Sequence, residues 1–111
     1  MLGFVFHEDW ARAHRQALDG FLDAANDAEQ LLAKSDSAWQ TVRPLMQAPD
    51  EALFAALRER FIRGITHPPR AEQERGAADL FAIMLRVGGS RATAGLSRLP
   101  DGIFWPDHEG T

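Results

Sequence analysis

The histidines are the residues of this chain with the greatest potential for chemistry. His7 and Glu8 open like the HExxH motif of zinc peptidases, but Ala11 stands where the second histidine would be needed. His14 lies about two helical turns from His7, roughly 10 Å along a helix axis, which is too far for both to bind one ion. His67 stands between a threonine and two prolines and is interpreted as part of a connector. No metal or cofactor site is therefore predicted.

A second candidate is a run of arginines in the middle of the chain, with glutamates between them. The arginines are at positions 58, 60, 63, 70 and 75, and the glutamates are at 59, 72 and 74. This mixture favours a solvated helix face with ion pairs four residues apart over a phosphate-binding patch. The net charge of −4 also argues against a nucleic-acid partner.

Composition narrows the functional class further. The 111 residues suffice for one domain, and 45% apolar with 25% charged residues is typical of a globular protein. Cysteine is absent, and no glycine-rich phosphate loop, GxSxG motif or supported carboxylate pair occurs. The sequence predicts a protein that is not an enzyme. No apolar run could cross a bilayer and no signal peptide is recognised, so the default expectation is a cytoplasmic location.

Apolar periodicity predicts a single helical domain over residues 1–111. The expected helices cover residues 8–34, 37–47, 50–64 and 70–87, and an extended tail covers residues 90–111. The longest of them should bury a stripe that contains Trp10, Phe21 and Leu32, and Leu18 and Leu22 widen this stripe. Stripes are likewise expected at Leu53, Phe54, Leu57, Phe61 and Ile65, and at Ala77, Leu80, Phe81, Met84 and Val87.

Several residues should start, break or end these helices. Gly20 marks either a close helix contact or a break within residues 8–34. The sequence SDS at residues 35–37 offers an N-cap, and Asp50 offers another. Pro44 should kink or end the second helix, and Gly88–Gly89 should end the fourth.

Apolar residues near the two ends of the sequence suggest contacts with another chain. Residues 2–6 (LGFVF) are strand-like but lack a neighbouring strand with which to pair. The apolar segment 103–105 should fold back onto the helices. The residues predicted as possible partner contacts are Leu2, Phe4, Phe6, Trp10 and Trp105.

Four segments in order resemble the C-terminal third of ABC-transporter substrate-binding proteins of the nitrate, sulfonate, taurine and thiamine-precursor type. They are GFVFHEDWA, AEQLLAKSDSAWQTVRPLM, DEALFAALRERFIRGI and LPDGIFW. The resemblance implies part of a two-lobed α/β periplasmic binding protein, in which a strand re-enters the first lobe and helices cover its outer face. It implies an ABC permease as partner and a periplasmic location for the full-length protein. It assigns no ligand-binding residue here, because the family's ligand contacts come largely from other segments.

The expected fold is mainly α, with four to five helices, one short N-terminal strand-like segment and an extended C-terminal arm. The leading functional hypothesis is a fragment or derivative of a solute-binding protein that does not bind solute in isolation. The alternative is a stand-alone helical interaction module, most simply a homodimer that pairs the LGFVF segments or buries exposed helix faces. The missing N-terminal portion is the other candidate partner.

Overall fold

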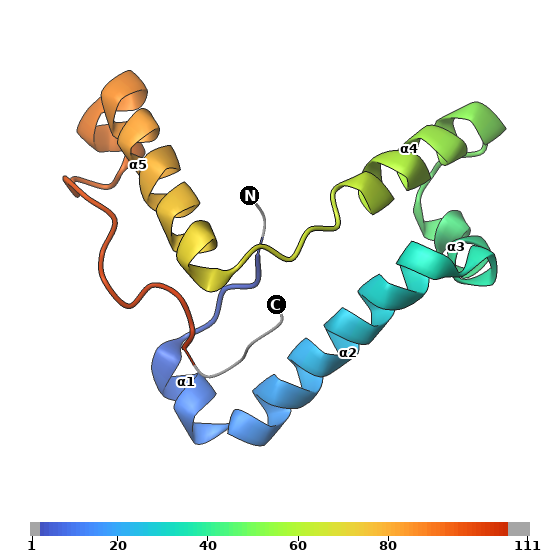
Figure 1. Cartoon of the computed structure of the whole chain (residues 1–111), viewed down its shortest axis with the longest axis horizontal. Helices are drawn as coiled ribbons and strands as arrows, with labels where there is room; N and C mark the ends of the chain where they lie inside the picture. Colours follow the sequence, from blue (N-terminus) through green and yellow to red (C-terminus); the bar gives the residue numbers. More distant parts are fainter. Residues whose placement is uncertain (1–2, 107–111) are drawn as a thin grey trace. The chain divides into compact units, whose positions relative to one another are not determined.

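The computed structural model describes residues 3–106, which form helices joined by turns (Figure 1). In chain order these are α1 (Glu8–Ala13), α2 (Arg15–Lys34), α3 (Asp36–Val42), the short 3₁₀ helix η1 (Arg43–Leu45), α4 (Glu51–Arg63) and α5 (Arg70–Ala92). Within residues 3–106 there is no strand, so the mainly α class is confirmed. Residues 3–6 of the predicted strand-like segment are irregular, since no described segment offers them a β partner.

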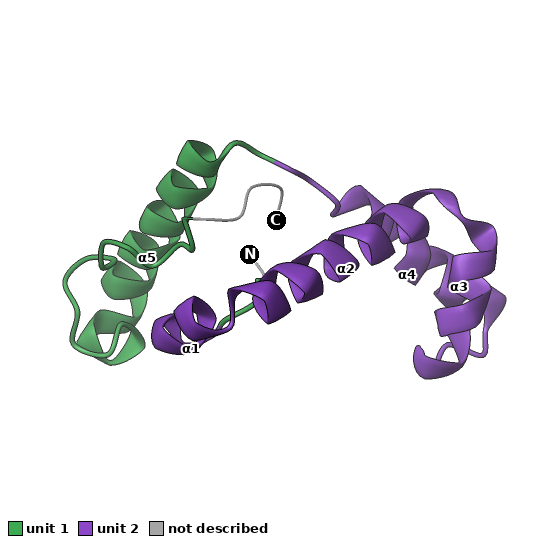
Figure 2. Cartoon of the chain, turned by 90° about the horizontal axis from the view of Figure 1, so that it is seen from below, with its two compact units in different colours: residues 1–5, 68–109 green, residues 6–67, 110–111 purple. Residues whose placement is uncertain are grey.

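The chain divides into two compact units, which are coloured separately in Figure 2. Unit 1 comprises residues 1–5 and 68–109, and unit 2 comprises residues 6–67 and 110–111. Unit 2 therefore contains α1 to α4, whereas unit 1 contains α5 and the arm that follows it.

The helix predicted over residues 8–34 is two helices, because the backbone breaks at His14. His14 has φ −129° and ψ 42°, which is not helical geometry. Its ring stacks on Trp10 with centroids 4.7 Å apart, and its Nδ1 lies 2.9 Å from the Trp10 carbonyl oxygen. The His14 backbone amide also donates to this carbonyl, at 2.9 Å, so the ring adds a local contact at the break without displacing the helical hydrogen bond. The prediction for Gly20 was wrong, since it lies inside α2 with open space around its Cβ position.

The corner between α2 and α3 follows the predicted capping residues. α2 ends at Lys34, and Ser35 caps α3 by accepting a hydrogen bond from the Ala38 amide at 3.3 Å. Pro44 ends this helix as predicted: α3 stops at Val42 and a 3₁₀ turn follows, instead of one helix over residues 37–47. Asp50 then caps α4 through the Ala52 amide at 3.0 Å.

Trp39 is the centre of the packed core of unit 2. It is 3% exposed and clusters with buried Ala48 and Phe54. Its indole Nε1 donates a 2.6 Å hydrogen bond to the Leu32 carbonyl, which ties α3 to the end of α2. Phe54 and Phe61 of α4 meet the indole edge-on, with ring centroids 6.4 and 5.5 Å away.

Two arginines close the edges of this core with their guanidinium groups. Arg43 lies 4.3 Å from the Phe54 ring centroid and forms an ion pair with Glu51 at 2.6 Å. Arg58 lies 5.6 Å from the Trp39 ring centroid and pairs with Asp36. Both arginines are only partly exposed, so their stems add packing as well as charge.

Unit 1 is built on α5 and the arm that returns to its first turn. Gly89 interrupts the helix with φ 66°, which supports the predicted stop at Gly88–Gly89, although helical residues resume as far as Ala92. The Arg70 guanidinium donates to the carbonyls of Trp105 and Pro106, the latter at 3.1 Å. The predicted return of the apolar tail is thus confirmed for Trp105, which is half-buried, as is Phe104, whereas it is wrong for Ile103, which is 58% exposed.

Most predicted apolar stripes are not buried, which corrects the sequence-based core. In α2 the predicted Leu18 and Leu22 are buried, whereas Phe21 of the same predicted face is 52% exposed. In α4 only Phe54 is buried, and Leu53, Leu57 and Phe61 are exposed. In α5 no residue is buried. The stripes exist, but within the described chain these helices meet too little opposing surface to cover them.

The first prediction concerns the Trp39 corner. Trp39→Phe should lower the free energy of unfolding by about 2 kcal/mol, because it removes the bond to the Leu32 carbonyl and part of the buried ring. Urea unfolding of the full chain, followed by helical circular dichroism, measures this change. Leu45→Ala, at a side chain 84% exposed, is the control and should shift stability by less than about 0.5 kcal/mol. Equal losses in the two variants would contradict the central position of Trp39.

Candidate functional site

The histidines considered as metal ligands lie at helix ends and are not gathered around a common point. His7 is the exposed N-cap residue of α1 and makes no side-chain capping bond. The His14 ring stacks on Trp10, and its Nδ1 contacts the Trp10 carbonyl oxygen. Among residues 3–106, no three His, Asp or Glu side chains gather closely enough to hold a metal ion.

The central arginines behave as the predicted solvated face. Arg63 pairs with Glu59 at 2.5 Å and Arg70 with Glu74 at 3.1 Å, both four residues apart on one helix. All four side chains are at least 40% exposed. Such pairs contribute about 0–1 kcal/mol each, and their charges are largely neutralised by one another. The preferred interpretation over an anion-binding patch is therefore supported.

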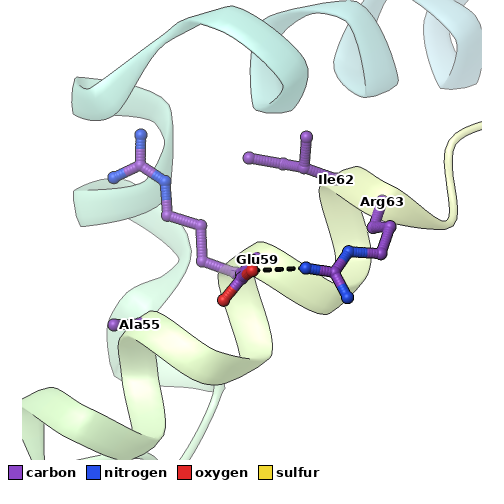
Figure 3. Close-up of a pocket in the computed structure, with 5 residues that line it drawn as sticks. Ala55, Glu59, Ile62 and Arg63 are labelled. Atoms are coloured by element: carbon purple, nitrogen blue, oxygen red, sulfur yellow. Dashed lines mark hydrogen bonds and ion pairs between the residues drawn. The ribbon is translucent and has the colours of Figure 1, made fainter.

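Two open hollows lie on the surface of the described chain. The first, of about 470 Å³, is shown in Figure 3 and is lined by Ala55, Arg58, Glu59, Ile62 and Arg63. All five residues come from α4, so a single helix forms the lining, and the Arg63–Glu59 ion pair crosses it. A ligand in this hollow would stay largely in water, unlike one in an enclosed binding site.

The second hollow, of about 480 Å³, lies where η1 leads into α4. Its lining is Gln40, Arg43, Pro44, Gln47, Ala48 and Pro49. The Arg43 guanidinium, its only charged group, is already engaged by Glu51 and the Phe54 ring. Neither hollow combines an enclosed apolar pocket with convergent free polar groups, so neither has the features of a solute site.

The residues predicted to contact a partner are spread over both units. Phe4 and Trp105 belong to unit 1, and Phe6 and Trp10 belong to unit 2. Phe4 is 59% exposed and Trp10 46% exposed, whereas Phe6 and Trp105 are half-buried. Leu2 lies outside the described residues. Two of the five, Phe4 and Trp10, thus present substantial apolar surface.

An exposed apolar face on α5 was not among the predicted contact residues. It lies on α5 and consists of Leu80, Ile83, Met84 and Val87, which are at least 42% exposed. Positions i, i+3, i+4 and i+7 share one side of a helix, so these four side chains form a continuous stripe. The sequence does carry a signal for it, namely the uncharged run LFAIML at residues 80–85, because a helix apolar all round needs cover on more than one side.

A second exposed face lies on α4 and comprises Leu53, Leu57 and Phe61, which are 40–46% exposed. Contiguous exposed apolar surface is typical of protein interfaces. None of the helices in the described chain is both long and apolar enough to cross a membrane. The chemistry that this structure offers is therefore burial of apolar helix faces.

The second prediction tests the exposure of α4. Leu57→Gln should lower the free energy of unfolding by no more than about 1 kcal/mol, because this side chain keeps 40% of its surface in water. Phe54→Ala, one turn earlier on the buried side, should cost about 4 kcal/mol through the cavity it leaves. Chemical denaturation of both variants provides the comparison. A loss in Leu57→Gln as large as that in Phe54→Ala would mean that the outer face of α4 is covered in solution.

No protein-family model matches the chain, and no curated protein is significantly similar to it in sequence.

Proposed function

We propose that this chain is a C-terminal fragment or derivative of an ABC-transporter solute-binding protein, without enzymatic activity of its own. The observation that carries the proposal is α5, which contains a long apolar run and yet buries no residue. Apolar stripes at helical spacing are ordinarily core, so their exposure is what a covering layer detached from its support would show.

The residues behind the family resemblance give a second line of support. The segment LLAKSDSAWQTVRPLM contains the Ser35 cap, the Asp36 partner of Arg58, and Trp39. These are the residues that fold the α2–α3 corner and attach α4 to it. The matched motif therefore has a structural reason to persist as a unit, independent of any solute.

Solute binding would require parts of a binding protein beyond this chain. The two hollows are open and their arginines are engaged in ion pairs. Under this proposal the cleft, the periplasmic location and the contact with an ABC permease belong to the full-length protein.

The second candidate function is a stand-alone helical interaction module that associates with itself. The exposed stripes on α4 and α5 favour it, because a second copy supplies apolar surface of the same kind. Under this alternative the chain acts in the cytoplasm and requires no transporter component.

The coding sequence that adjoins this chain tests the leading proposal. A reading frame for the other two thirds of a solute-binding protein, or neighbouring genes for an ABC permease and ATPase, supports the transport assignment. If the adjoining sequence contains neither, the transport assignment is contradicted.

The third prediction is that the isolated chain shows no specific thermal stabilisation by nitrate, taurine or a thiamine-precursor pyrimidine at 1 mM. A ligand with a dissociation constant of 10 μM would stabilise the folded state by about 2.7 kcal/mol at this concentration. For a chain of this size such a gain raises Tm by roughly 10 °C or more. Differential scanning fluorimetry measures the shift, with sodium chloride as the ionic control. A shift of several degrees with one solute alone would contradict the assignment of the cleft to other segments.

A further inference from the structure

We propose that the α5 stripe is a self-association site, on which the same helix of a second copy docks in antiparallel orientation. The inference rests on the second candidate function, self-association, and specifies the helix, the orientation and the charges that select it. It uses α5 alone, so it does not depend on how the two units are arranged.

The stripe has the spacing of a short two-helix seam. Gly76, Leu80, Ile83 and Val87 are separated by four, three and four residues, which places them along one line of the helix. Ala77 and Met84 lie beside this line. From residue 76 to residue 87 the seam spans about 16 Å, or roughly three helical turns.

Side-chain size along the seam favours the antiparallel orientation. Its N-terminal end is small, with Gly76 and Ala77, and its C-terminal end is large, with Met84 and the 80% exposed Val87. Antiparallel pairing places Val87 of each copy against Gly76 of the other, and Leu80 against Ile83. The two helices then keep an even separation. Parallel pairing would oppose Val87 to Val87 and Gly76 to Gly76, and it would leave a void at one end.

Charge along the flank favours the same orientation. Asp79 and Arg86 are the only charged residues between positions 76 and 90, and they are seven residues apart on the same side of the stripe. Neither forms an ion pair with another residue in the described part of the chain. An antiparallel pair brings Asp79 of each copy alongside Arg86 of the other, which gives two opposite-charge contacts. A parallel pair would leave both groups beside apolar residues.

The space around the seam is compatible with a close approach of two helices. A Cβ added at Gly76 would meet no atom within 4 Å, so the backbone there is open to a neighbour. A contact of three turns lies at the small end of specific interfaces, and the expected dimer has a dissociation constant in the micromolar range or weaker.

Charge reversal of the full chain is the decisive experiment, measured by sedimentation equilibrium from about 1 μM to 1 mM. Arg86→Asp should raise the dimer dissociation constant at least tenfold, because four carboxylates then line the flanks. The double variant Asp79→Arg, Arg86→Asp should restore association to within about threefold. Arg91→Asp, which makes the same charge change beyond Gly89, is the matched control and should alter it less than twofold. Circular dichroism checks that every variant keeps its helical content.

Disulfide trapping tests the orientation, because the native chain contains no cysteine. A mixture of Gly76→Cys and Val87→Cys chains should oxidise mainly to the mixed dimer. Predominant Val87→Cys self-crosslinking would overturn the antiparallel arrangement. A dimer that ignores charge reversal would overturn the α5 site while leaving self-association intact. A chain that stays monomeric throughout the concentration range would overturn both.

Discussion

The hydrogen bond from the Trp39 indole to the Leu32 carbonyl is the interaction on which the packed part of the molecule depends. It fixes the corner after α2, and the indole then provides the surface against which Phe54 and Phe61 bring α4. Arg58 lies over the same indole ring and forms an ion pair with Asp36. One buried polar atom with a satisfied partner thus orients three helices, because an indole N–H without an acceptor would be costly in this position.

Outside this corner, apolar side chains on α4 and α5 lack neighbouring side chains to pack against. α4 turns Phe54 inward and leaves Leu53 and Leu57 in contact with water, and α5 leaves its whole stripe uncovered. Helices in proteins gain most of their stability from packing of an apolar face, and these two faces have little packing within the described chain. The two functional proposals share this premise and differ in whether the missing surface belongs to a binding-protein lobe or to another copy.

The polar groups point to the same conclusion by a different route. The arginines of α4 and the first turn of α5 are largely paired with carboxylates, and His14 is stacked on Trp10. Within the described residues the charged side chains therefore shape and solubilise the helices. Under the self-association proposal the apolar face of α5 forms the contact, and Asp79 and Arg86 select its orientation.

The helical class and most helix boundaries follow from the sequence alone. Ser35 and Asp50 cap helices, Pro44 ends one, and Gly89 interrupts another. These effects are local, since each depends on a side chain and the backbone within a few residues of it. The break at His14 escaped prediction because no residue type that ordinarily ends a helix stands there, and the stack of its ring on Trp10 is visible only in the structure. Only the tertiary structure decided which apolar stripes are covered, because periodicity reveals that a helix has an apolar face but not whether a neighbour is there to bury it.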